Sequence, residues 1–260
     1  MRFFVIISLL GVAFAAPNSR IMGGADTAIE DYPFFASIEY NTYDVWFLHC
    51  GGALISNDAI LSAASCFVAS DPAFHRARLG SSNATTGGTL ETIGQFILHP
   101  NFNRVTMEND IALLRLQLNV EESQTIQYAS IPGPNYVLAD NFALTAIGVG
   151  RRAPGDIRPA KLQSVRLNLI NRELCAARYA VLQAEPGYEN WPTVTNTMMC
   201  TAVLDQPGIG TCQGDNGGPI TAQGNVVYGV ASWQYSCGSD IFPSVNTWVS
   251  PFSNWIQANV

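Results

Sequence analysis

The feature that most constrains the fold of this chain is a succession of short apolar runs between residues 34 and 249, separated by Gly, Pro, Asn and Asp. Many runs alternate apolar and polar residues, and few keep the period of a helix. Short alternating runs between turn-forming residues are typical of an all-β sandwich or a pair of β-barrels. The clearest predicted strands are residues 35–40, 52–55, 60–63, 95–98, 111–116, 142–147 and 226–232.

Two segments carry helical signals. Asn171 is placed to cap a short helix that we expect to continue through Tyr179, because Asn is a favoured N-cap residue. Pro251 suits the first position of a final helix, in which Phe252 and Ile256 can share an apolar face with Trp255.

The N-terminus has the layout of a secretory signal peptide. Residues 1–15 hold one cation, Arg2, then an apolar run that ends at a small-x-small cleavage site, Ala13-Phe14-Ala15. The run is too short to span a bilayer, and no later run is long enough; a buried N-terminal strand is the alternative interpretation. We therefore expect export, with a signal peptide over residues 1–15, a propeptide over 16–20 and one domain over 21–260.

The charge of the chain restricts its partners. The 260 residues carry a net charge of -7, so nucleic acid and anionic membrane are not expected as partners. All the cations except Lys161 are arginines, which stay charged at alkaline pH. This fits an alkaline extracellular fluid such as a gut lumen, although chance composition explains it almost as well, and haemolymph is also open.

Six cysteines in an exported chain predict three disulfides, but their spacing does not choose among the many pairings. A zinc site is the alternative interpretation. Close Cys-x-x-Cys or Cys/His spacing of the kind that binds zinc is absent, so we expect no metal and no other cofactor. In addition, Asn83-Ala84-Thr85 matches the N-glycosylation sequon.

The segment with the most specific chemistry is Gly214-Asp215-Asn216-Gly217-Gly218-Pro219. By itself it could be only a tight turn, since all these residue types tolerate turn geometry. It is accompanied, in chain order, by Ile21-Met22-Gly23-Gly24, His49-Cys50-Gly51-Gly52, Ala63-Ala64-Ser65-Cys66, Asn109-Asp110-Ile111-Ala112-Leu113-Leu114, Ser232-Trp233 and Trp255-Ile256. Together these segments resemble the chymotrypsin/trypsin family of serine endopeptidases, in particular insect trypsins of the lepidopteran type, from residue 21 to the end of the chain.

This resemblance implies a fold of two packed antiparallel six-stranded β-barrels with a C-terminal helix, as a monomer. It implies the disulfides Cys50–Cys66, Cys175–Cys200 and Cys212–Cys237. It also implies an activation cut after Arg20, which would free the amino group of Ile21 to pair with Asp215, and oxyanion donors in the backbone amides of Gly214 and Asn216.

The resemblance fails at two catalytic positions. The family has its nucleophilic serine where this chain has Asn216, and its histidine base where this chain has Ser65. A carboxamide has no hydroxyl to attack with, and a serine accepts no proton near neutral pH. Asp110 matches the orienting carboxylate, which we expect to be buried and bonded to Ser65. We expect the three histidines, His49, His75 and His99, to be structural or at the surface.

The substrate pocket also departs from the family pattern. Gly210 stands where trypsins have an acid, and Gln234 and Ser244 replace glycines at the pocket mouth. We expect that the pocket forms no ion pair with a basic substrate side chain and that its entrance is narrowed. The alternative is a peptidase pocket that prefers a different substrate side chain. A long segment before Cys200 carries Tyr188 and Trp191, which we expect either to contact a partner or to pack under their own loop.

From these residues we predict a secreted serine-protease homologue that is not an enzyme. It would act by binding proteins, as a decoy for protease inhibitors or as an adaptor in a proteolytic or immune cascade. An active trypsin-like endopeptidase with degenerate motifs, for example one that uses Ser65 as nucleophile, is the first alternative. A structural or storage protein is the second.

Overall fold

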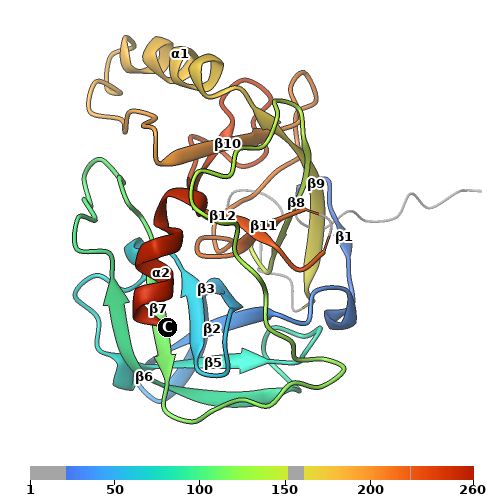
Figure 1. Ribbon diagram of the computed structural model, residues 1–260. Helices are drawn as coiled ribbons and strands as arrows, with labels where there is room; N and C mark the ends of the chain where they lie inside the picture. The colour runs from blue at the N-terminus through green and yellow to red at the C-terminus, as the bar shows by residue number, and fades with distance from the viewer. Residues whose placement is uncertain (1–21, 152–160, 223) are drawn as a thin grey trace, which may run out of the picture.

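The computed structural model describes residues 22–151, 161–222 and 224–260 (Figure 1). The predicted signal peptide and propeptide, with Arg20 and Ile21, lie outside the described residues. The all-β prediction is confirmed: two closed antiparallel barrels of six strands each are followed by a short C-terminal helix.

The first barrel is built from the first half of the chain. Its interior is filled by side chains that the alternating runs turn inward, including Ile38, Leu54, Ile60 and Leu114, all fully buried. Around the barrel the strands follow the order β2-β3-β4-β7-β6-β5. Their bounds are β2 (Phe35–Thr42), β3 (Val45–Leu54), β4 (Ala59–Ser62), β5 (His75–Leu79), β6 (Thr89–Leu98) and β7 (Ala112–Leu116).

The second barrel is formed by the order β9-β10-β13-β12-β11-β8 and closes through the pairing of β8 with β9, while a short strand β1 (Ala25–Asp26) is added along β9. Its interior holds Leu144, Leu167 and Ile220. The bounds are β8 (Ala143–Gly148), β9 (Gln163–Ile170), β10 (Met198–Ala202), β11 (Pro219–Thr221), β12 (Val227–Trp233) and β13 (Ser244–Trp248).

Helices are few, as the sequence predicts. Asn171 caps α1 (Arg172–Gln183), and its side-chain oxygen accepts a hydrogen bond of 3.0 Å from the amide of Leu174. The helix therefore begins where predicted but continues a turn beyond Tyr179. A 3₁₀ turn η4 (Ser250–Phe252) leads into α2 (Ser253–Asn259), and three further 3₁₀ turns are η1 (Ile29–Asp31), η2 (Ala64–Cys66) and η3 (Pro72–Phe74).

A shared apolar cluster joins the two barrels. It includes Phe34, Leu61 and Ile111 from the first half of the chain and Val230 and Ile256 from the second. Figure 1 shows α2, in red, returning to the side of the first barrel near β7. One continuous apolar core therefore fixes the two barrels relative to each other.

The C-terminal helix is also held to β7 by polar contacts. The guanidinium of Arg115, on β7, donates a hydrogen bond of 3.2 Å to the carbonyl oxygen of Asn259 and pairs with the carboxylate of Asp58. These contacts fix the end of the chain against the first barrel.

All six cysteines are paired as the resemblance implied, in Cys50–Cys66, Cys175–Cys200 and Cys212–Cys237. The first bond ties β3 to the turn that carries Ser65. The third ties the segment before Asp215 to the loop after Trp233. Two of the three disulfides therefore fix segments that border the cleft.

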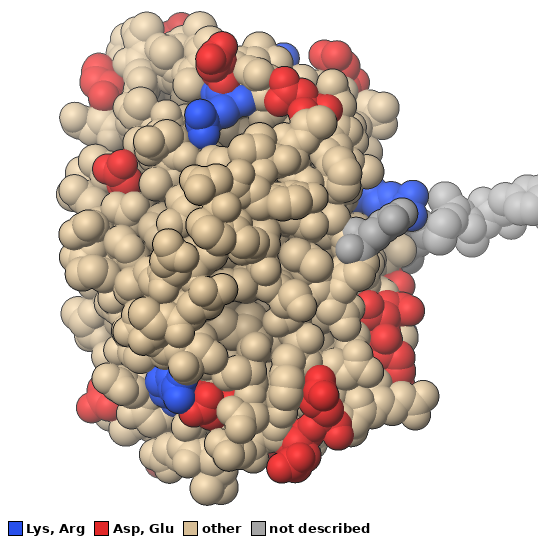
Figure 2. All heavy atoms as spheres, viewed as in Figure 1, with Lys and Arg blue, Asp and Glu red and all other residues tan. Residues whose placement is uncertain are grey.

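The described residues contain no helix that could cross a membrane. Figure 2 shows one face of the molecule, on which charged side chains are sparse and lie mostly toward the edge, with acidic ones more numerous than basic ones. This distribution agrees with the net charge of -7.

Candidate functional site in the cleft between the barrels

A hollow of about 550 Å³ lies where the two barrels meet. The turn after β4 places Ser65 on one wall, and the loop before β11 places Gly214 and Asn216 on the other. The remaining lining residues are His49, Cys50, Cys66, Met107, Gln213, Ser232, Trp233 and Gln234. The structure thus brings together the positions that the sequence pointed to as a site.

Asp110 lies next to Ser65 and is fully buried. One carboxylate oxygen accepts a hydrogen bond of 2.6 Å from the amide of Ser65, and the other accepts bonds of 2.9 Å from the Ser65 hydroxyl and 2.5 Å from the Ser232 hydroxyl. The predicted bond between Asp110 and Ser65 is confirmed.

The electrostatics of Asp110 follow from its burial. Desolvation raises the pKa of this carboxyl, and the hydrogen bonds from Ser232 and Ser65 oppose that rise. The sequence analysis missed the role of Ser232, although the Ser232-Trp233 segment was part of the pattern. A hydroxyl on the opposite barrel gives no sequence signal that it reaches Asp110.

Asn216 is held by hydrogen bonds to both barrels. Its side-chain nitrogen donates a hydrogen bond of 2.5 Å to the carbonyl oxygen of Ser232, and its own carbonyl oxygen accepts a bond of 2.8 Å from the amide of Gly51. The turn after it requires glycine. A Cβ at Gly217, whose φ is +77°, would lie 2.3 Å from the hydroxyl oxygen of Ser62. The Asn216 amide group is thus fixed toward β12.

Two backbone amides at this turn have no acceptor. Among the hydrogen bonds of the described residues, none uses the amide of Gly214 or that of Asn216. Gly214 has a φ of +97°, a conformation that glycine adopts at little cost. A pair of unpaired amides beside a cleft can stabilise a developing oxyanion. This geometry depends on the backbone, so it does not require a serine at position 216.

Asp215 points into the second barrel. Its carboxylate accepts hydrogen bonds of 2.7 Å from the amide of Gly150 and 2.9 Å from the amide of Cys212. Glycine is needed at position 150, because a Cβ there would lie 2.5 Å from either carboxylate oxygen. The predicted pairing of Asp215 with the amino group of Ile21 concerns a residue outside the described range.

The three histidines take no part in a catalytic pair. A ring nitrogen of His49 lies 2.6 Å from the carbonyl oxygen of Cys66, and the ring of His75 is buried among Tyr40, Phe67 and Phe96. Burial lowers the pKa of His75.

His99 packs against the rings of Phe252 and Trp255 near the C-terminal helix, and burial lowers its pKa as well. Although His49 borders the cleft, none of the three rings contacts Asp110 among the described residues.

The predicted pocket residues Gln234 and Ser244 are linked by a third polar side chain, that of Thr211. The hydroxyl of Thr211 lies 2.9 Å from that of Ser244 and 3.3 Å from the side-chain oxygen of Gln234. Gly210, at the base, brings no charge. Thr211 was missed in the sequence analysis, and it connects the two positions that were named. None of these side chains offers a carboxylate to a cationic substrate side chain.

Tyr188 and Trp191, which precede Cys200, are half-buried and pack against other aromatic rings. The Trp191 ring contacts those of Tyr188 and Tyr235, with centroids 5.7 and 6.0 Å away, beside the cluster that surrounds the Cys175–Cys200 bond. The second of the two sequence interpretations, packing under their own loop, describes Trp191.

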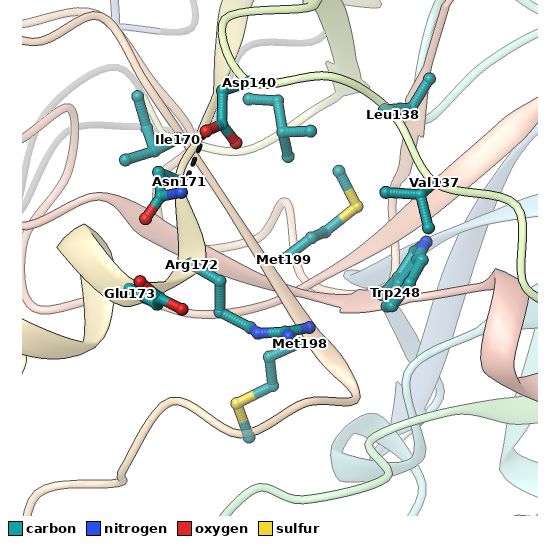
Figure 3. Close-up of a pocket in the computed structure, with 11 residues that line it drawn as sticks. Val137, Leu138, Asp140, Ile170, Asn171, Arg172, Glu173, Met198, Met199 and Trp248 are labelled. Carbon is teal, nitrogen blue, oxygen red and sulfur yellow. Dashed lines mark hydrogen bonds between the residues drawn. The ribbon is translucent and has the colours of Figure 1, made fainter.

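A second cavity, of about 260 Å³, lies away from the cleft at the start of α1 (Figure 3). Met198, Met199 and Trp248 contribute its apolar wall. Its polar groups are already paired, since the Asn171 side chain donates a bond of 2.9 Å to Asp140 and the Arg172 guanidinium donates one of 3.2 Å to the carbonyl oxygen of Asn196. These groups cap and anchor the helix, so the cleft remains the candidate site. The described residues hold no group of three acidic, histidine or cysteine side chains that could bind a metal.

Comparisons with known proteins give a consistent family. The family model described as Trypsin matches residues 21–256. The chain is 39% identical to "Trypsin CFT-1" of Choristoneura fumiferana, over 95% of this chain and 93% of that protein. It is 37% identical to "Trypsin, alkaline A" of Manduca sexta over the whole of both chains, and 35% identical to "Trypsin" of Phaedon cochleariae over 99% and 98%.

These comparisons contradict the prediction that the chain is not an enzyme. Relatives that match it from end to end are named trypsins, which points to a protease. The prediction rested on Ser65 and Asn216 alone. A binding cleft and backbone amides that stabilise an oxyanion can accelerate hydrolysis without those two side chains. The replacement of the family's histidine and serine therefore did not suffice to exclude hydrolysis.

Proposed function

Because the chain belongs to the trypsin family of serine proteases, we propose that it is a secreted endopeptidase with an altered catalytic set. It binds an extended polypeptide in the cleft between the barrels and hydrolyses it slowly. The observation that carries this proposal is the hydroxyl of Ser65, bonded to the buried carboxylate of Asp110 on the wall of a cleft that also holds two unpaired amides.

In this mechanism Ser65 is the nucleophile and Asp110 is the general base. The Ser65 oxygen attacks the carbonyl carbon of the substrate, and its proton moves to the carboxylate oxygen 2.9 Å away. The amides of Gly214 and Asn216 stabilise the oxyanion. The leaving amine takes the proton back as the C–N bond breaks, and water then hydrolyses the acyl group. Burial assists the first transfer, since a raised pKa makes Asp110 a better base than an exposed carboxylate.

The rate should be low. A carboxylate accepts protons far less readily near neutral pH than the imidazole that this site lacks. Binding and oxyanion stabilisation without an intact triad leave about 10³–10⁴-fold acceleration over water, and we expect Ser65 to add about tenfold or more to that.

The pocket determines which peptides are accepted. The Thr211 hydroxyl is bonded to both Gln234 and Ser244, and none of the three side chains is a carboxylate. We therefore propose that the residue before the cleaved bond is small and uncharged. The polypeptide partners of this cleft are such substrates and the inhibitors that imitate them, and export through the predicted signal peptide would bring the chain to them.

The test uses the Arg20-cleaved full chain with two peptide esters that differ only in Ala or Arg before the ester. We expect slow turnover of the Ala ester and at least a tenfold lower rate on the Arg ester. Ser65→Ala should reduce the rate on the Ala ester by about tenfold or more, as expected when a nucleophile is removed.

The matched control is Ser70→Ala, which changes a serine of similar exposure a few residues away. It should leave the rate unchanged. No turnover by the wild-type chain, or equal turnover by the Ser65→Ala variant, would refute the proposed chemistry.

A further inference from the structure

Residues 80–88 connect β5 to β6 and run across to the second barrel. Ser82 anchors the loop through two hydrogen bonds. Its hydroxyl oxygen accepts one of 2.8 Å from the amide of Ile29, and the carbonyl oxygen of Ser82 accepts one of 2.8 Å from the amide of Leu162. Ala84 is buried in the cluster between the barrels. These anchors fix the loop on both sides of Asn83.

The Asn83 side chain forms hydrogen bonds through its oxygen but, among the described residues, none through its nitrogen. Its oxygen accepts hydrogen bonds of 3.0 Å from the amide of Thr85, 3.1 Å from the Thr85 hydroxyl and 3.2 Å from the amide of Thr86. Its side-chain nitrogen makes no hydrogen bond among the described residues. A substituent on that nitrogen would therefore break none of these contacts.

We propose that Asn83 is an N-glycosylation site. Asn83-Ala84-Thr85 is the single Asn-x-Ser/Thr segment in the 260 residues, and such segments accept glycans in exported proteins. A bond forms between the Asn83 nitrogen and the anomeric carbon of a lipid pyrophosphate-linked oligosaccharide. The nitrogen loses one proton, and the lipid pyrophosphate leaves with the electrons of the broken C–O bond. The proposal rests on the export included in the proposed function.

The folded structure has room for the sugar. Next to Asn83 is a hollow of about 510 Å³, lined by small hydroxyl side chains and edged by an ion pair in which the Lys161 nitrogen lies 3.6 Å from a carboxylate oxygen of Asp26. Thr85 and Thr86 are exposed. Sugar hydroxyls can bond to such groups at an open surface, whereas a sugar on a buried asparagine would prevent folding.

The position of the loop gives the glycan a structural consequence. Asp26 belongs to β1, a two-residue edge strand with both residues exposed. Exposed edges are sites of unwanted pairing between chains. A glycan on Asn83 would cover this edge while leaving the cleft, whose lining residues are different, open to polypeptides.

The experiment expresses the full chain, from Met1, in insect cells and measures the mass of the secreted protein and of its peptide spanning residue 83. We expect a mass excess on the order of 1 kDa, removed by peptide N-glycosidase with conversion of Asn83 to Asp. Asn83→Gln and Thr85→Ala should lose the excess. Thr85→Ser, which keeps the hydroxyl, should retain it.

Secreted protein with unmodified Asn83, or a chain that remains in the cell without a glycan, would overturn the proposal. An equal mass excess in Asn83→Gln would also overturn it, because the sugar would then be elsewhere. The result is independent of hydrolysis: a glycosylated chain without esterase activity would refute the proposed chemistry and leave the Asn83 site intact.

Discussion

Asp110 shows at the residue scale how one buried carboxylate organises a site. It accepts two hydrogen bonds from Ser65 and one from Ser232, so residues of both barrels meet on a single group. A buried charge is costly unless it is bonded in this way. The bonds keep the carboxylate in place although no imidazole accompanies it.

The raised pKa of Asp110 predicts a particular pH dependence of stability. In the folded state the carboxyl holds its proton more tightly than in the unfolded state, where the pKa is near 3.8. The folded state therefore loses relative stability as the pH rises from about that value through the raised pKa. The free energy of unfolding of the wild type, minus that of Asp110→Asn, should decrease over this window.

Urea unfolding at a series of pH values measures that difference. Asp44→Asn, in an exposed turn, is the control and should show no such trend. A difference that stayed constant or grew with increasing pH would contradict the assignment of the raised pKa to Asp110.

The retained scaffold predicts that a conventional triad can be restored. A variant with both Ser65→His and Asn216→Ser would place an imidazole beside Asp110 and a hydroxyl next to the oxyanion amides. We expect turnover of the Ala ester to rise by about 10³-fold or more over the wild type, because triad members act as a unit. Each single variant should gain far less. A folded double variant with wild-type activity would mean that the cleft geometry is not competent.

At the scale of elements, α1 depends on a covalent tie to the second barrel. The Cys175–Cys200 bond joins the helix to β10 across 25 positions, and Tyr179 and Leu182 pack beside it. The helix itself is short, and short helices are marginal without tertiary contacts. The disulfide and these two buried residues are therefore what keep α1 in place.

Replacing both Cys175 and Cys200 by Ser should lower the free energy of unfolding by about 3 kcal/mol, the usual scale for a loop of this size. Denaturant unfolding monitored by far-ultraviolet circular dichroism measures the change. The control replaces Ser70 by Ala and should have a negligible effect. A loss below about 0.5 kcal/mol would show that packing alone holds the helix.

At the scale of the whole molecule, the C-terminal helix unites the two barrels. Ile256 is 1% exposed and belongs to the cluster between them, and Asn259 is bonded to Arg115 on β7. Since this core is shared by both halves of the chain, the barrels should unfold together. A substitution that weakens the cluster should therefore destabilise both barrels.

Ile256→Ala should therefore destabilise the protein by about 2–5 kcal/mol, the cost of a large-to-small change in a core. Calorimetry should show a single transition at a lower temperature. Gln257→Ala, on the exposed side of the same helix, is the matched control and should change the stability by less than about 0.5 kcal/mol. Two separate transitions in either variant would contradict the shared core.

Much of the fold could be predicted from local pattern. Strand β2 alternates apolar and polar residues from Ser37 to Asn41, β7 is a short apolar run, and Asn171 carries its capping signal in its own side chain. The strands that were not predicted are β1, β5, β9, β10, β11 and β13. Met198–Ala202 is buried at every position, so it has no alternation to show, and Ser244–Trp248 carries buried polar residues that resemble a loop.

The sequence by itself determined the class of fold, the family, the positions of the altered catalytic residues and the bond between Ser65 and Asp110. The fold class follows from local spacing and residue chemistry, whereas the family, these positions and the Ser65–Asp110 bond follow from the segments that match the family pattern. Only the tertiary structure decided that Ser232 reaches Asp110, that Thr211 bonds to Gln234 and that Asn83 lies beside a hollow. The physical reason is the same in each case: these contacts join segments distant in the chain, and their partners are chosen by barrel closure and packing rather than by neighbours in sequence.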